Sequence, residues 1–290
     1  MNGNTPILSM RSFAKQLNDL TFTDYYYRLM LLARSVFKWE GLPNGMDEKW
    51  IERFLFRYGK CVFFKDENRG FMVAECNPDG TLNNYEEPVN VRAAGIDVDS
   101  SKSLIVNQDC VLIRNNDEMT ATSYFVKLFA YRLAEISRTI DININAQKTP
   151  VLILGSEKQR LTLKNIYAQW NGFEPVIFGD KNLDTEGMKV LKTDAPTVFP
   201  ELQTQKQTIW NECLTFLGIN NANTDKRERL ITHEVLANND HIDLSAECFL
   251  KSRQIAAEQI NKLFGTNITV SLRKESEREC MQDIQNTSVI

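Results

Sequence analysis

The chain has 290 residues and a mass of 33.4 kDa, and 42% of its residues are hydrophobic while 25% are charged. These proportions exclude a disordered chain, a collagen and a disulfide-stapled miniprotein. A net charge of −4 excludes a protein that grips nucleic acid over a broad basic surface, so any such contact must be local or arise by assembly. No apolar run reaches the roughly 18 residues of a membrane span, and the first residues lack the basic and apolar regions of a signal peptide. We therefore expect neither a transmembrane helix nor a secretory leader.

Helical signals dominate the first part of the chain. Residues 7–40 are compatible with a long helix, which Gly41 and Pro43 would end. A second helix is predicted after Asp47, a good N-cap residue, and Gly59 suits its C′ position. The expected apolar face of this second helix consists of Trp50, Ile51, Phe54, Leu55 and Tyr58.

Short apolar runs then predict a small β-rich unit. CVFFK at 61–65 and FMVAEC at 71–76 are separated by polar residues, and NPDG at 77–80 is a strong turn signal. A further strand pair is expected within 89–94 and 104–114.

Two long amphipathic helices are predicted next, and the simplest geometry for them is an antiparallel pair. The segment 123–144 has apolar residues at steps of three and four and predicts a helix about 30 Å long. Another helix is expected to begin near Pro200 and to end before Gly218. The expected apolar stripes are Tyr124, Phe125, Leu128, Phe129, Leu133, Ile136 and Ile140 in the first helix, and Leu202, Ile209, Trp210, Cys213, Leu214 and Leu217 in the second.

The insert between these helices, residues 151–191, predicts a small α/β unit. VLIL at 151–154 and PVIF at 175–178 have the composition of short buried strands. LTLKNIYAQW at 161–170 between them predicts a helix. The antiparallel helix pair would project this insert away from the main body.

The C-terminal part combines a polar tract with one more helix. Residues 220–244 are polar and mixed in charge, which predicts a mobile loop. Ser245 is expected to cap a helix that Gly265 ends. Residues 268–272 alternate apolar and polar side chains as a strand does.

The sequence contains no recognised catalytic motif: it has no P-loop, no GxGxxG after a strand, no HExxH and no GxSxG. His233 and His241 are eight residues apart in the polar tract, which is no recognised metal spacing, so we interpret them as solvated loop residues. The six cysteines form no CxxC pair and predict buried free thiols rather than zinc ligands or disulfides. We therefore expect no metal and no cofactor. That the chain is not an enzyme is an expectation that follows from the family resemblance described below.

Basic side chains gather at two places in the second half of the chain. Lys226, Arg227 and Arg229 lie in the polar tract, and Lys192 precedes the bend before the second long helix. In a monomer these are ordinary surface charges. In a closed ring, symmetry would repeat each of them around the axis.

Six short strings carry a family resemblance: FKWEGLP at 37–43, NAQKTPVLI at 145–153, VLKTD followed by APTVF up to 199, WNECLTFLGINNAN at 210–223, KRERLITHEV at 226–235 and FLKSRQIAAEQINKLFG at 249–265. In this order and with these gaps, the chain resembles the portal proteins of phi29-like small tailed podophages, also called connector or upper collar proteins. The resemblance covers most of the chain, from about residue 20 to residue 275.

The resemblance implies an α+β, mainly helical portal fold with a long-helix stem, a small α/β clip insert and a mixed α/β wing, assembled as a ring. The implied boundaries are 1–120 for the N-terminal wing, 121–150 for the first stem helix, 151–191 for the clip, 192–219 for the second stem helix, 220–238 for a channel loop, and 239–290 for the C-terminal wing and crown.

The resemblance further implies a homododecamer at one capsid vertex, which conducts double-stranded DNA during packaging and ejection. The implied partners are the major capsid protein, the tail or lower collar protein and the packaging motor (an ATPase, with or without RNA), without a membrane. The implied location is the virion, after assembly in the host cytoplasm. Non-specific phosphate contacts are expected from Lys192, Lys226, Arg227 and Arg229, and the expected channel loop includes Asn221, Asn223, Asp225 and His233.

The sequence departs from the family pattern at two places. Glu201 stands nine residues after Lys192, where related stems can carry a lysine, and the first ten residues contain no Lys or Arg, although related chains can begin with a basic arm. Two alternatives stay open on the residues alone. One is a metal-dependent nuclease with unrecognised acidic ligands, and the other is a monomeric interaction module whose aromatic stripes form a core.

Overall fold

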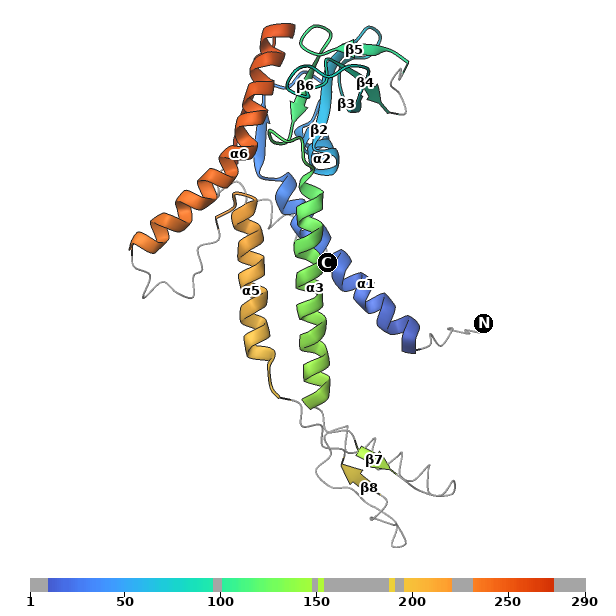
Figure 1. The fold of residues 1–290 in the computed structure, drawn as a ribbon, viewed down its shortest axis with the longest axis vertical. Helices are drawn as coiled ribbons and strands as arrows, with labels where there is room; N and C mark the ends of the chain where they lie inside the picture. The colour runs from blue at the N-terminus through green and yellow to red at the C-terminus, as the bar shows by residue number, and fades with distance from the viewer. Residues whose placement is uncertain are drawn as a thin grey trace, which may run out of the picture. The chain divides into compact units, whose positions relative to one another are not determined.

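The computed structural model describes residues 10–95, 101–147, 151–153, 188–190, 196–220 and 232–273 (Figure 1). The chain divides into two units, one formed by Met1–Glu135 with Lys206–Ile290 and the other by Ile136–Gln205. The helices are α1 (Met10–Arg34), α2 (Glu48–Tyr58), α3 (Thr122–Gln147), α5 (Phe199–Phe216) and α6 (Thr232–Phe264). The strands are β1 (Phe37–Glu40), β2 (Lys60–Asp66), β3 (Gly70–Pro78), β4 (Asn90–Ala94), β5 (Ser103–Ile105), β6 (Cys110–Arg114), β7 (Val151–Ile153), β8 (Met188–Val190) and β9 (Thr269–Leu272).

A five-stranded antiparallel sheet, in the order β5-β4-β3-β2-β6, forms the β-rich part of the first unit. Strand β2, which lies between β3 and β6, is apolar and buried from Cys61 to Phe64 because both faces of the sheet are covered there. Phe63 belongs to one buried cluster, with residues of α2 and α6, while Val62 and Phe64 belong to another on the opposite face. The strands predicted at 61–65, 71–76 and 89–94 are confirmed, and 104–114 contains two strands, β5 and β6.

The prediction of one helix over residues 7–40 is wrong at its C-terminal end. Helix α1 ends at Arg34, where Ser35 bonds back to the Leu32 carbonyl through its backbone N–H and its hydroxyl. The next residues form β1, which pairs with β9 so that Trp39 lies opposite Val270. Phe37 and Trp39 alternate with polar residues at the strand period, and both are buried.

Helix α2 has the predicted ends but a rotated buried face. The Asp47 side chain accepts the Lys49 backbone N–H, and Gly59 adopts the left-handed conformation, with φ +74°. The buried side chains are Ile51, Glu52, Leu55 and Phe56, whereas Trp50 and Tyr58 are exposed, contrary to the expected face. The helix buries a glutamate because that carboxylate has a partner inside the protein.

Within the first unit, the start of α3 packs against the end of α5, as expected for an antiparallel pair. The rings of Phe125 and Phe216 are 4.9 Å apart, and Cys213 and Leu217 share one buried cluster with α1 and α3. The expected stripe on α3 is only partly correct, because the buried side chains there are Val126, Ala130, Leu133 and Ala134. Alanines let the helices approach closely and leave larger side chains of the expected stripe at the surface.

In the second unit, the strand predicted at 151–154 is confirmed as β7, which pairs with β8. The predicted helix at 161–170 and strand at 175–178 lie outside the described residues. The end of α3 contacts the segment before α5, because Asn143 donates to the Pro196 carbonyl at 2.8 Å.

Helix α6 corrects two further predictions. It begins at Thr232 and passes through Ser245 without interruption, so Ser245 is not its cap and residues 232–244 are not a loop. The reason is that Ile242, Ala246 and Phe249, at helical spacing, extend the buried face upstream of Ser245. The expected end at Gly265 and the strand at 268–272 are confirmed.

Four cysteines are buried free thiols as expected: Cys61, Cys76, Cys110 and Cys213. Burial raises the pKa of Cys76, Cys110 and Cys213 to about 12, so these thiols stay protonated at neutral pH. Cys248 differs from the expectation, because it is exposed on α6, and Cys280 lies outside the described residues. Over the described part of the chain, no helix is long and apolar enough to cross a membrane.

Candidate functional site

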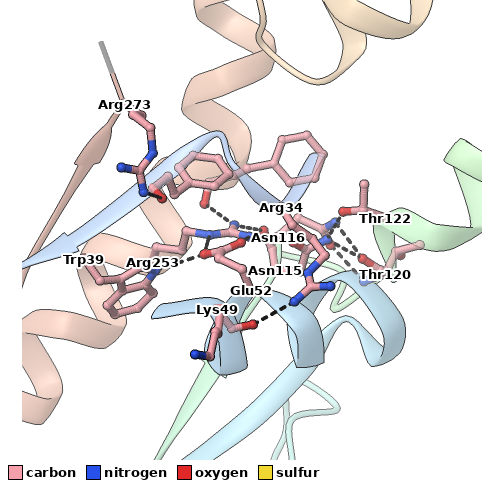
Figure 2. Close-up of polar contacts among 12 residues, drawn as sticks. Arg34, Trp39, Lys49, Glu52, Asn115, Asn116, Thr120, Thr122, Arg253 and Arg273 are labelled. Atoms are coloured by element: carbon pink, nitrogen blue, oxygen red, sulfur yellow. Dashed lines mark hydrogen bonds and ion pairs between the residues drawn. The ribbon is translucent and has the colours of Figure 1, made fainter. Parts of the chain in front are cut away.

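A buried ion pair connects α2 to α6 (Figure 2). Arg253 on α6 donates through Nε and Nη2 to the two carboxylate oxygens of Glu52 on α2, at 2.9 and 2.8 Å. Both side chains are only 3% exposed. Glu52 also accepts the indole N–H of Trp39 in β1 at 2.9 Å. Charges buried this deeply cost several kcal/mol unless each is paired and hydrogen-bonded.

The remaining donors of Arg253 bind the turn before α3 and the preceding turn of α6. Nη2 also donates to Asn115 Oδ1 at 3.0 Å, and Nη1 donates to the carbonyl oxygens of Asn115 and Phe249 at 3.0 and 2.9 Å. All five N–H donors of the guanidinium therefore have an acceptor. Its carbon also lies 4.0 Å from the centre of the Phe37 ring, a cation–π contact.

Asn115 fixes the turn from which α3 begins. Its side-chain amide donates to the Thr120 carbonyl at 2.8 Å and to Thr122 Oγ1 at 2.9 Å, and its backbone N–H donates to the Gly59 carbonyl at 2.9 Å. A Cβ on Gly59 would lie 1.9 Å from the Met119 carbonyl oxygen, so this close approach requires glycine. The end of α2 and the start of α3 are thereby held together.

A second ion pair lies beside the first. Arg273 bonds to Glu48 at the start of α2, and its Nε donates to the Ser35 carbonyl at 3.2 Å. The other oxygen of Glu48 accepts the Trp39 backbone N–H at 2.8 Å. We call the cluster formed by Arg253, Glu52, Asn115 and this second pair the polar junction.

The polar junction encloses little space for a ligand. The cavity lined by Glu52, Asn115 and Arg253 has a volume of about 10 Å³, which is room for one water molecule at most. Among the described residues, no group of histidine, cysteine and carboxylate side chains has the geometry to hold a metal ion. The arrangement holds helices and strands in place and has no room to bind a substrate.

Sequence reasoning did not find the polar junction. Glu52 stands among apolar residues of α2, and its partner Arg253 is 201 residues away in the chain. One signal was available in the sequence. Ile51, Leu55 and Phe56 also form an apolar face at helical spacing, and this face includes the charged residue Glu52.

Most of the site residues predicted from the sequence lie outside the described residues. These are Lys192, Asn221, Asn223, Asp225, Lys226, Arg227 and Arg229. His233, expected in the channel loop, belongs instead to the first turn of α6, and His241 is an exposed residue of the same helix. This part of the loop prediction is corrected for the reason given above, namely that the helical pattern extends upstream.

The surface of α3 carries large apolar side chains on one face. Tyr124, Leu128 and Tyr131 are 71%, 48% and 57% exposed and are spaced by four and three residues, so they form a contiguous stripe. We call these residues the α3 stripe. Helix α1 carries a similar exposed row of Leu20, Tyr27 and Leu31.

The comparison with protein families decides the identity of the chain. The model of the family Phage Connector (GP10) matches residues 9–277. The chain belongs to the phage connector family. This confirms the resemblance seen in the sequence and makes this connector a portal protein.

Several solved structures are similar to this chain. A chain of the portal and tail of native bacteriophage P68 is 15% identical, with a TM-score of 0.51 over 97% of this connector and 96% of that chain. An HK97-family phage portal protein from Corynebacterium diphtheriae is 9% identical over 92% and 95% of the two chains, with a TM-score of 0.44. A chain of the virion of a native gene transfer agent particle is 11% identical over 100% and 93%, with a TM-score of 0.47.

The connector family is structural rather than enzymatic, and no comparison supports the nuclease hypothesis. The predicted α+β portal fold is confirmed. Membership in this family implies partners in the capsid and tail and a place in the virion.

Proposed function

We propose that this connector assembles as a homododecameric ring at one capsid vertex and conducts double-stranded DNA during packaging and ejection. The observation that carries the proposal is the α3 stripe of this connector-family chain. Scattered exposed apolar residues are normal in a monomer, but contiguous ones mark interaction sites. A ring requires two different, complementary faces on each subunit. The α3 stripe and the exposed row on α1 are candidates for these faces.

Burial of the α3 stripe against another subunit would be energetically favourable. Burying one large apolar side chain stabilises an assembly by about 1.5–3 kcal/mol. Tyr124, Leu128 and Tyr131 together would contribute about 4.5–9 kcal/mol, a substantial part of the roughly 4–15 kcal/mol that association costs. A monomeric interaction module would leave the same side chains in water.

We also propose the finer assignments that the family suggests. Residues 1–120 and 239–290 would form the wing, 121–150 and 192–219 the stem, and 151–191 the clip that meets the tail or lower collar protein and the packaging motor. Assembly would occur in the host cytoplasm. The start of α6 at Thr232 shortens the proposed channel loop to about residues 220–231.

The proposed channel contacts are Lys192, Lys226, Arg227 and Arg229. A conduit must release DNA, so its contacts should be few, exchangeable and directed to phosphates, without base specificity. A chain with net charge −4 and a few rings of basic side chains would supply such a wall.

The first experiment measures the native mass of the purified chain and images the same sample by negative-stain electron microscopy. A closed ring of twelve subunits with a central hole is the expected result. A chain that stays monomeric or dimeric under all conditions would contradict the proposal.

The variant Leu128→Gln/Tyr131→Gln tests the α3 stripe directly. Glutamine keeps the helical propensity while it removes the apolar surface. We expect the loss of about 3–6 kcal/mol per contact, enough to convert rings into smaller species. The matched control is Leu82→Gln/Tyr85→Gln, because both residues are exposed on the loop before β4. Equal ring formation by both variants would exclude the α3 stripe as a subunit contact.

Lys192→Ala tests the channel assignment, with exposed Lys102→Ala as its control. We expect Lys192→Ala to form rings as the wild type does and to change DNA retention or translocation in a packaging assay. Loss of ring formation by Lys192→Ala alone would contradict its placement in the channel.

A further inference from the structure

The surface of α2 carries two arginines that form no ion pair with any residue that the structure describes. Arg53 and Arg57 are one helical turn apart, and like charges at this spacing destabilise a helix. The Arg53 guanidinium carbon lies 5.6 Å from the centre of the exposed Trp50 ring, and Lys49 Nζ lies 5.3 Å from it. Cationic groups therefore surround an aromatic face that water can reach.

Arg34 at the end of α1 extends this basic surface across the seam between α1 and α2. Its Nη2 donates to the Lys49 carbonyl at 3.1 Å (Figure 2). Farther along the seam, the rings of Tyr26 and Phe56 are 6.3 Å apart, so the two helices run antiparallel. The hydrogen bond to the Lys49 carbonyl places the Arg34 side chain against the turn of α2 that precedes Arg53. Burial lowers the pKa of Arg34, the positive charges of Arg53 and Arg57 lower it further, and Glu52 acts in the opposite direction.

The carboxylates of this region are already bound to other cations. Asp47 pairs with Lys49 at 2.8 Å, Glu48 pairs with Arg273, and Glu52 pairs with Arg253. Across the described part of the chain, no ion pair is formed by the three arginines of the seam, Arg34, Arg53 and Arg57.

One atom of the seam also lacks a hydrogen-bond acceptor. Arg34 Nε is buried and has no partner within the described residues. A buried donor without an acceptor is costly and rare in folded proteins. Because Nε is enclosed by protein atoms, an anion from solvent would meet the arginine cluster through its exposed guanidinium groups instead.

We propose that Arg34, Arg53 and Arg57, with Trp50 beside them, form an anion-binding site in the seam between α1 and α2 that takes the phosphate backbone of a nucleic acid. The guanidinium group binds phosphate through paired donors, and a row of such groups matches the repeated charge of a phosphodiester backbone. A single carboxylate would neutralise only one of the three charges. The site is distinct from the proposed channel contacts and does not depend on ring formation.

The test measures binding of short duplex DNA to the full chain by fluorescence anisotropy over a potassium chloride series. Arg53→Gln/Arg57→Gln should weaken binding about tenfold at low salt and should reduce the slope of log affinity against log salt by about one to two, since each phosphate contact contributes about 0.9. The matched control is Lys102→Gln/Lys251→Gln, which removes two exposed positive charges elsewhere. An unchanged affinity and slope in the Arg53/Arg57 variant would overturn the proposal.

Two parallel measurements separate other occupants of the site. Inorganic phosphate, at matched ionic strength, should raise the melting temperature of the wild type more than that of the Arg53/Arg57 variant. Duplex DNA should compete with inorganic phosphate for the same site. Stabilisation by phosphate with no arginine-dependent DNA binding would identify a small-anion site and overturn the nucleic-acid assignment. A variant that binds DNA normally but fails to form rings would assign the arginines to carboxylates of a second copy, which also overturns it.

Discussion

The two faces of helix α2 differ in whether their charged side chains form ion pairs. On its inner face, Glu52 meets Arg253, whose five donors all have acceptors. In the seam with α1, Arg53 and Arg57 form no ion pair among the described residues. Burial explains the difference. A buried charge is destabilising unless it is paired inside the protein, whereas water solvates an exposed charge and leaves it able to bind an external partner. One short helix thereby serves as an internal anchor and as a basic surface.

The strongest way to break the inner face is to remove one charge of its ion pair. Glu52→Gln should lower the free energy of unfolding by about 3–5 kcal/mol, because Arg253 would stay buried without its counter-charge. Urea unfolding of the purified chain measures this. Exposed Glu67→Gln is the matched control and should change stability by less than about 0.5 kcal/mol. Equal stability of the two variants would show that the polar junction tolerates an unpaired arginine.

The close approach at the end of α2 gives the next largest effect. Gly59→Ala should cost about 3 kcal/mol, because the new Cβ combines a left-handed backbone with a collision against the Met119 carbonyl. Gly70→Ala isolates the backbone term, since Gly70 has φ +78° but open space around its Cβ. We expect about 1 kcal/mol for this control. Equal losses in the two variants would mean that the α2–α3 connection can shift.

A smaller, pH-dependent effect distinguishes the N-terminal end of α2. Hydrogen bonds from Lys49 hold the pKa of Asp47 below its ordinary value. Its charge therefore stabilises the fold above the unfolded-state pKa of about 4, and this contribution is lost as pH falls through the lower folded-state pKa. Asp47→Asn keeps the cap without the charge, so thermal melts should show less than about 1 kcal/mol difference at neutral pH. That difference should shrink at acidic pH, and a constant one would contradict the electrostatic explanation.

The basic surface should give the smallest effect on stability, and with the opposite sign. Arg53→Gln/Arg57→Gln should leave the unfolding free energy unchanged or raise it by about 0.2–0.5 kcal/mol, because repulsion one turn apart is removed. The same urea series measures it at low salt. A clear loss of stability would mean that these arginines stabilise the fold, as Arg253 does. It would contradict the difference proposed between the two faces of α2.

Local signals were sufficient to predict both ends of α2 and the strands of the main sheet. Asp47 and Gly59 bound α2 as expected, because an N-cap and a left-handed C-cap depend on the residues next to them. The family could also be recognised, since short strings in a fixed order survive in the sequence.

Partners that are distant in the chain account for the main errors in the fold. The segment from Phe37 to Glu40 becomes a strand because β9 pairs with it, and no local pattern reveals that pairing. The buried face of α2 is displaced because Glu52 is neutralised by Arg253 of α6. In α6, a polar stretch without glycine or proline forms a helix because Ile242 and Ala246 are covered elsewhere in the fold. The predicted channel residues, by contrast, stay predictions.

The ion pair between Glu52 and Arg253 also sets an order of events during synthesis. Its two members are 201 residues apart, which at about 5–20 residues per second corresponds to about 10–40 s of translation. Until α6 leaves the ribosome, Glu52 has no counter-charge and β1 has no neighbouring strand, so the nascent N-terminal part cannot close its core. A chain that ends before α6 therefore leaves this buried cluster without the side chains that α6 contributes to it.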